Sequence, residues 1–100
     1  MTKISSRSRE VAEKIRDHVA FETYGALKAT LADRLSRWDS GQLAGEDLEK
    51  FYADLPQITY VVWSYSTPIA WVCSDGNFHK VSQRFSVTTS KHQGKLYLLS

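Results

Sequence analysis

Two apolar runs in the second half of the chain constrain its fold more than any other feature of the sequence. Residues 58–65 and 69–73 are rich in β-branched and aromatic side chains and have no helical periodicity, which predicts two strands. Residues 66–68 between them are a serine, a threonine and a proline, so a turn and an antiparallel hairpin are expected. Pro56 precedes the first run and marks the end of the helical part of the chain.

Both faces of this expected hairpin are apolar. In the first run Tyr60 and Val62 point to one face, while Val61 and Trp63 point to the other. A sheet with one face in water normally alternates apolar and polar residues. We therefore expect helices to cover one face. A partner protein, a second copy of the chain or the C-terminal segment would cover the other.

Further strands are expected after the hairpin. Asp75-Gly76 favours the positive backbone angles of a tight reversal, which predicts a third strand at 78–81. Residues 84–89 form a fourth β-branched run, and 96–99 add either a fifth strand or a tail packed on the sheet. The short connections between these runs favour an antiparallel meander.

The first half of the chain is predicted to be helical. Apolar residues recur every three or four positions in residues 8–20 and 24–38, and a shorter helix is expected at 45–54. The apolar stripe of the second helix consists of Leu27, Leu31, Leu35 and Trp38. The predicted fold class is α+β, with two to three N-terminal helices packed on a three- to five-stranded antiparallel sheet. The helical half is about 8–55 and the β half about 58–99.

Length and composition fit one ordinary globular domain spanning residues 1–100. The chain is 42% hydrophobic and 24% charged, which is enough apolar material for one core. Cys73 is the only cysteine, which excludes an internal disulfide. No run of about 18 apolar residues is present, and the first residues lack the apolar core of a signal peptide. These features predict a cytoplasmic protein that does not span a membrane.

A polar segment at the end of the expected fourth strand is the strongest candidate for a site. Residues 88–93 combine hydroxyl, imidazole and amide groups. On a strand Ser90 and His92 would share a face, so His92 would be placed to act as a general base for Ser90. A hydrolase also needs an orienting carboxylate and an oxyanion hole, and the sequence identifies neither. We therefore expect no catalytic residues. Ser90, His92 and Gln93 are candidates for ligand contact or, more commonly, for satisfying backbone groups at a strand end.

Two other chemical arrangements are weaker. Cys73 and His79 flank the Asp75-Gly76 turn and would form a cysteine–histidine pair, but a lone cysteine is more often a small buried hydrophobe. The three histidines lack the spacing typical of a metal site. We expect neither a metal nor a cofactor.

The aromatic residues of the hairpin are candidates for binding a partner. Trp63, Tyr65 and Trp71 belong to the two apolar runs or the turn between them. If the strands pair around residues 66–68, Trp63 and Trp71 lie close together across the hairpin. If these rings are buried, they form the core. If they are exposed, they are interface residues of the kind that dominate binding energy.

Nucleic-acid binding is the alternative function. The β half carries four basic residues and one acidic residue, and aromatic residues lie between the basic ones. The four basic residues are Lys80, Arg84, Lys91 and Lys95. The whole chain has a net charge of only +2, and no known nucleic-acid-binding motif is visible.

Two segments of the β half resemble a known motif pair. Residues 64–71 follow the pattern S-Y-x-T-P-I-A-W, and residues 86–93 follow S-V-T-T-S-x-H-Q. Over about residues 58–93 the chain resembles a family of small, mostly uncharacterised proteins of actinobacterial phages and their hosts. The resemblance implies a phage-encoded or prophage-encoded protein in the cytoplasm of a mycobacterium-like host. It implies no activity and no site residues.

Together these features predict a small non-enzymatic interaction protein. Its partner would be a host or phage protein, and self-association as a homo-oligomer is an alternative. The two-sided apolar hairpin, the many aromatic residues and the lack of a complete catalytic set support this interpretation.

Overall fold

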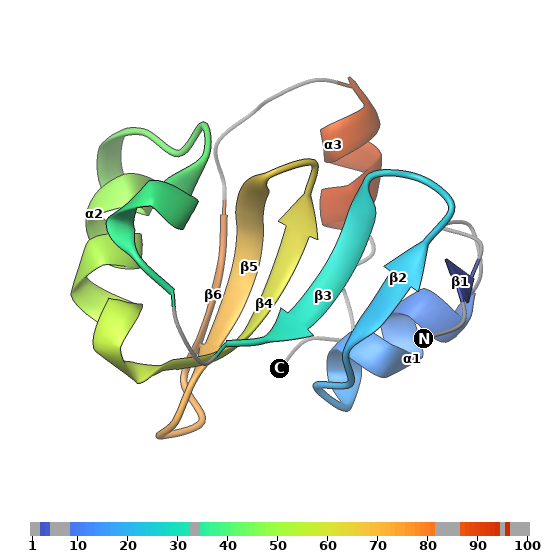
Figure 1. Ribbon diagram of the computed structural model, residues 1–100, viewed down its shortest axis with the longest axis horizontal. Coiled ribbons are helices and arrows are strands. Elements are labelled where there is room, and N and C mark those ends of the chain that lie inside the picture. The colour runs from blue at the N-terminus through green and yellow to red at the C-terminus, as the bar shows by residue number, and fades with distance from the viewer. Residues whose placement is uncertain (1–2, 5–8, 33–34, 82–86, 95, 97–100) are drawn as a thin grey trace.

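The chain folds around one twisted β-sheet with helices on both sides (Figure 1). The computed structural model describes residues 3–4, 9–32, 35–81, 87–94 and 96. The strands of these residues are β1 (Lys3–Ile4), β2 (Phe21–Thr23), β3 (Leu27–Leu31), β4 (Ile58–Ser64), β5 (Thr67–Cys73) and β6 (Phe78–Lys80). The helices are α1 (Arg9–Arg16), α2 (Gly45–Asp54) and α3 (Val87–Gln93), with two short 3-10 helices, η1 (Arg37–Ser40) and η2 (Leu55–Gln57).

The sheet confirms the α+β class and, from β2 to β6, the antiparallel meander, but the described residues form six strands where three to five were expected. The strand order is β1-β2-β3-β4-β5-β6, and every pair from β2 to β6 is antiparallel. β1 pairs with β2 in parallel, so α1 is the crossover helix between them. The sequence did not predict this edge strand. None of the helices in the described part of the chain is long and apolar enough to cross a membrane.

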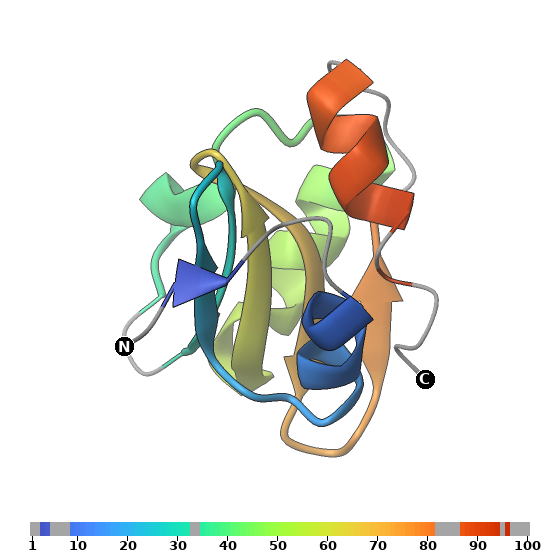
Figure 2. The same cartoon turned by 90° about the vertical axis from the view of Figure 1, so that its right-hand side faces the viewer.

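The β4–β5 hairpin lies in the middle of the sheet and is buried on both faces. Every residue of the two strands except Thr59 is buried. On one face α1 packs Val11 and Ile15 into a cluster with Tyr60. On the other face Phe51 of α2 meets the ring of Trp71 edge-on, with 5.2 Å between the ring centroids. In Figure 1, α2 and η1 lie to the left of the β4–β5 hairpin and α1 and α3 to its right, and Figure 2, seen from that right-hand side, shows α1 in front of the sheet and α2 behind it.

The chain therefore covers both faces of its own hairpin. We expected helices on one face only, with a partner, a second copy or the C-terminal segment on the other. The structure places α1, α3 and the buried Leu96 on one face and α2 on the other. The two-sided apolar pattern thus follows from packing within one chain and does not require a second molecule.

The predicted helix over 24–38 is wrong, because these residues begin with a turn and β3. A spacing of four residues is a multiple of the two-residue strand period, so Leu27 and Leu31 share a face in a strand as well as in a helix. β3 also pairs along its whole length with β4. The turn is fixed by Thr23, whose hydroxyl donates to the Leu27 carbonyl oxygen at 2.6 Å and accepts from the Gly25 N–H at 3.2 Å.

Three further expectations are corrected or untested. Residues 87–93 form α3 instead of the end of a strand over 84–89, because their hydrogen bonds to the sheet outweigh the β propensity of the segment.

The β4–β5 turn was expected at residues 66–68. It consists of Tyr65 and Ser66, and Thr67 already belongs to β5. Residues 82–86 and 97–100, which include most of the two last predicted strands, lie outside the described residues.

A close backbone contact holds η1 against the β4–β5 turn. Gly41 follows η1 with a φ of +56°, and a Cβ atom there would lie 2.5 Å from Thr67 Oγ1 and 2.6 Å from the Ser66 carbonyl oxygen. The next residue, Gln42, donates its backbone N–H to the same Thr67 hydroxyl at 3.0 Å. The position of η1 on the molecule therefore depends on glycine at 41.

We predict that Gly41→Ala lowers the free energy of unfolding by about 2 kcal/mol or more, because it adds a steric clash to an unfavourable φ. Gly45→Ala is the matched control, since Gly45 has a similar φ of +60° but a Cβ atom there would have no neighbouring atom within 4 Å. Gly45→Ala should lower the free energy of unfolding by only about 1 kcal/mol. Urea denaturation measures both losses, and equal losses would contradict a role for close packing at Gly41.

Candidate functional site

The two motif segments of the sequence meet at a buried polar cluster. Ser64, at the end of β4, places its Oγ 2.7 Å from His92 Nδ1 and 3.0 Å from Thr89 Oγ1, both on α3. All three side chains are buried, and Ser64 is only 1% exposed. Gln93 donates its side-chain amide to the Val81 carbonyl oxygen at 2.9 Å. These contacts attach α3 to the sheet.

The Ser64–His92 pair has the atoms of a catalytic pair but not the access. A nucleophile must reach a substrate, and a serine with 1% exposure cannot. Burial lowers the pKa of His92, so its imidazole stays neutral at physiological pH. Ser90 was expected to share a face with His92 on a strand, but both residues belong to the helix α3, so that argument for pairing them no longer applies. We assign His92, Thr89 and Gln93 to holding α3 in place.

The hairpin tryptophans are core residues. Trp71 is fully buried, and Trp63 is 9% exposed and donates its indole N–H to Thr30 Oγ1 at 2.9 Å. They do not face each other, because Val61 pairs with Trp71 while Trp63 pairs with Pro68. Trp71 is closed to any partner and Trp63 reaches the surface only in the lining of a small hollow, so the two rings do not form the exposed interface that the hypothesis required. Tyr65, the third aromatic candidate, is 59% exposed at the turn.

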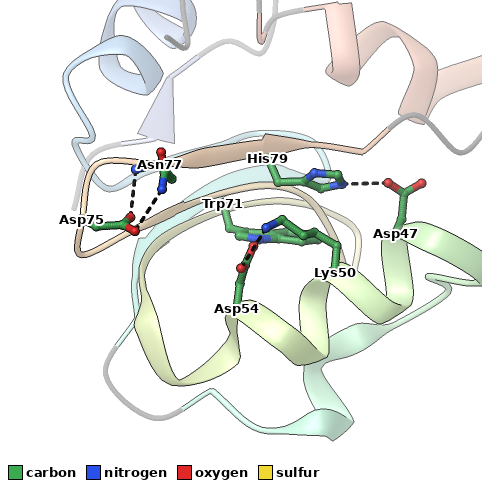
Figure 3. Close-up of polar contacts among 7 residues, drawn as sticks. All are labelled: Asp47, Lys50, Asp54, Trp71, Asp75, Asn77 and His79. Carbon is green, nitrogen blue, oxygen red and sulfur yellow. Dashed lines mark hydrogen bonds and ion pairs between the residues drawn. The ribbon is translucent and has the colours of Figure 1, made fainter.

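A second polar cluster surrounds the edge of Trp71 between α2 and β6 (Figure 3). The Trp71 indole N–H donates to Asp54 Oδ2 at 2.8 Å, and Lys50 donates to Asp54 Oδ1 at 3.1 Å. The imidazole of His79 lies against the Trp71 ring, with 4.8 Å between centroids, and its Nε2 is 2.8 Å from Asp47 Oδ1. A carboxylate beside an imidazole can orient a general base, but a catalytic set also needs a nucleophile or a bound water at the free nitrogen.

Cys73 does not supply that nucleophile. Its side chain is buried, and burial, with smaller contributions from Asp54 and Asp75, raises the pKa of the thiol. A thiol with a raised pKa stays protonated at neutral pH and is a poor nucleophile. The burial of Cys73 agrees with the expectation of a small buried hydrophobe, and His79 contacts Asp47. Within the described residues, no three potential ligands gather as a metal site.

The basic residues proposed for nucleic-acid binding are described only in part. Lys80 lies on the edge strand β6 with its ammonium 5.7 Å from the centroid of the Phe78 ring, and Lys91 is exposed on α3. Arg84 and Lys95 lie outside the described residues. The described part of this set comprises one exposed lysine on β6 and one on α3.

A more exposed aromatic site lies around Trp38 of η1. Trp38 is 93% exposed and forms a wall shared by two surface hollows. We call these hollows and the residues around them the Trp38 surface. The larger hollow, about 500 Å³, is lined by Arg37, Trp38, Ser40, Gly41 and Tyr52. The smaller one, about 230 Å³, is lined by Lys28, Trp38, Asp39, Trp63 and Ser66.

The fold fixes the position of Trp38. The Asp39 carboxylate accepts hydrogen bonds from the Ser36 N–H at 2.8 Å and from the Ser36 hydroxyl at 3.3 Å, which closes the turn of η1 around Trp38. Gly41 holds the other end of η1 on the β4–β5 turn. The backbone that carries the exposed indole is therefore held at both ends of η1, which reduces the backbone entropy lost on binding.

The backbone of Tyr65 lies next to this surface, at the same end of the sheet. The next residue, Ser66, lines the smaller hollow. The backbone N–H of Tyr65 donates to the Ala26 carbonyl oxygen at 3.0 Å, so the β2–β3 turn lies beside the β4–β5 turn. Tyr65 has a φ of +58°, a conformation that glycine adopts far more easily at the first position of a two-residue hairpin turn. An exposed tyrosine in a strained conformation is more typical of a functional position than of a stabilising one.

The sequence pointed to only part of this site. Tyr65 was a candidate because of its place in the hairpin, whereas Trp38 was assigned to the apolar stripe of a helix that does not form. Arg37, Lys28 and Tyr52 were not candidates at all, because they come from three separate elements. The usable signal was local: Arg37-Trp38 directly precedes the stop signal Asp39-Ser40-Gly41, where a tryptophan has little chance of burial.

We predict that Ser64→Ala lowers the free energy of unfolding by about 1–3 kcal/mol, because it leaves the buried His92 Nδ1 without its partner. Ser66→Ala, two residues along in the exposed turn, is the control and should change stability by less than about 0.5 kcal/mol. Urea denaturation gives both values. A small effect of Ser64→Ala would show that α3 is held mainly by apolar contacts.

We also predict that His92 makes stability fall in mild acid. The unfolded chain takes up a proton near the ordinary histidine pKa of 6.5, whereas the folded pKa of His92 is lower, so acid favours the unfolded state below that pH. His92→Asn keeps an acceptor for Ser64 but does not titrate. The unfolding free energy measured at about pH 7.5 and about pH 5.5 should therefore drop more in the native chain than in the variant. An equal drop would mean that groups other than His92, which both proteins share, account for it.

Comparison with known proteins identifies a family but no characterised relative. No curated protein matches the chain. No solved structure matches it either. The profile of a family of unknown function (DUF8033) matches residues 20–98, from the start of β2 to beyond α3. This range includes Ser64, His92 and Trp38, and it extends well beyond the 58–93 segment of the motif resemblance. The chain belongs to this family of unknown function, DUF8033.

Proposed function

We propose that this protein is a non-enzymatic interaction module that binds another protein through the Trp38 surface. The observation that carries the proposal is the 93% exposure of Trp38 beside two hollows. Tryptophan is the residue type most enriched at the centres of binding interfaces, and a large ring left in water gains the free energy of burial only when a partner covers it.

The contacts around Trp38 support binding more than catalysis. The surface combines the aromatic rings of Trp38 and Tyr52 with the cation of Arg37, the composition typical of interface centres. The polar groups that resemble catalytic pairs lie elsewhere, and the most complete of them, Ser64 with His92, is buried. A binding surface needs exposure and shape, and the Trp38 surface supplies both.

We further propose that the partner is a protein of an actinobacterial host or of a phage that infects it, met in the host cytoplasm. The support is the resemblance of residues 64–71 and 86–93 to motifs of small actinobacteriophage proteins. The two segments lie side by side in the fold, joined by the Ser64–His92 contact. A motif pair that anchors α3 beside the hairpin would keep this end of the sheet rigid.

We predict that Trp38→Ala stays folded but reduces capture of the partner at least about tenfold, since loss of a central interface tryptophan removes about 1.4 kcal/mol or more of binding free energy. The tagged chain would be incubated with mycobacterium-like lysate, with and without nuclease, and bound proteins quantified by mass spectrometry. Tyr65→Ala should show a smaller loss in the same direction.

Leu31→Ala is the matched control, because Leu31 is a large exposed apolar residue (67%) at the far end of β3 from the two turns. It should capture the partner as the native chain does. Equal capture by Trp38→Ala and the native chain would overturn the proposal. Capture that disappears with nuclease in all variants would favour the nucleic-acid alternative instead.

A further inference from the structure

We infer that the partner segment that occupies the larger hollow is a peptide carrying a carboxylate next to an apolar side chain. The inference rests on the proposed function and specifies the chemistry of its partner. Its basis is the charge of the Trp38 surface, where each hollow has one basic residue in its lining, Arg37 in the larger and Lys28 in the smaller.

Arg37 is the better placed of the two cations to recognise a carboxylate. Its guanidinium lies over the ring of Tyr52, with 5.1 Å from the carbon centre to the ring centroid. Stacking covers one face of the guanidinium but leaves the N–H groups along its edge directed in the plane. These donors match the two oxygens of a carboxylate in a bidentate pair. Lys28 lies directly opposite Glu22 across the β2–β3 ladder, so part of its charge is balanced within the sheet.

The acid within the surface is engaged within its own turn. Asp39 lines the smaller hollow, but its Oδ2 already accepts two hydrogen bonds from Ser36. The walls of the larger hollow beside Arg37 are the rings of Trp38 and Tyr52 and the backbone around Gly41. An apolar side chain can pack against the rings while a neighbouring carboxylate pairs with the guanidinium.

The charge of α2 favours an acidic peptide over a nucleic acid. α2 carries four acidic residues and one lysine, a net charge of −3, and it contributes Tyr52 to the hollow. A nucleic-acid strand is a continuous polyanion that would have to pass this helix, whereas one or two carboxylates can be held at Arg37. The volume of about 500 Å³ also suits one or two side chains.

The test uses two probe peptides with the full chain labelled with ¹⁵N. One probe is acetyl-Ala-Glu-Leu-Glu-Ala-amide, and the other has glutamine in place of both glutamates. Titration of the glutamate peptide should move the Trp38 indole resonance to saturation, and the glutamine peptide should bind at least about tenfold more weakly. Arg37→Gln should abolish this difference, and Trp38→Ala, followed through its backbone amide resonances because it lacks that indole, should abolish binding of both peptides. Arg37 is exposed, so the variant should stay folded, which its amide spectrum would show.

Three results would overturn the inference: equal affinity for the two peptides, no movement of the Trp38 indole, or movement caused instead by a ten-nucleotide single-stranded DNA. The lysate experiment distinguishes failure of this inference from failure of the proposed function. If capture still depends on Trp38 while the peptides are not discriminated, the interaction module stands and only the acidic chemistry is wrong. If capture is independent of Trp38 as well, both proposals fail.

Discussion

The burial of the β4–β5 hairpin on both faces is the constraint on which the rest of the structure depends. Thirteen of its fourteen strand residues are buried, so each face needs its own cover. α1, with Leu96, provides an apolar cover on one side and α2 on the other, and the neighbouring strands protect the edges of the hairpin. Apolar area removed from water on two faces is what allows a chain of 100 residues to stabilise a single sheet.

The polar groups inside this arrangement are explained by the same constraint. The indole N–H groups of Trp63 and Trp71 donate to Thr30 and Asp54, and the hydroxyl of Ser64 pairs with α3. Every fully buried side-chain nitrogen or oxygen among the described residues has a hydrogen-bond partner. Such contacts avoid the desolvation penalty of burial, and they account for the polar motif residues without chemistry. Function is then better sought where the structure leaves large side chains uncovered, at Trp38 and Tyr65.

The part of the fold that could be predicted is the part with a single consistent local pattern. The hairpin, the following short strand and the helices at 9–16 and 45–54 each combine strong periodicity or β-branched composition with clear turn signals. The errors fall where the pattern fits two structures. Leu27 and Leu31 satisfy the period of a helix and of a strand, and only the available edge of β4 decides between them. The segment that became α3 begins with β-branched residues, and its contacts with the sheet override that local preference.

The sequence by itself determined the class of the fold, the central hairpin and the burial demand on both of its faces, because these follow from the chemistry of adjacent residues. The tertiary structure alone decided which residues meet. It joined Ser64 to His92, 28 positions apart, and placed Trp38 beside Lys28, Tyr52 and the β4–β5 turn. It also decided exposure, burying Trp63 and Trp71 while leaving Trp38 in water. The physical reason is that burial is a property of packing between distant segments, which no local pattern specifies.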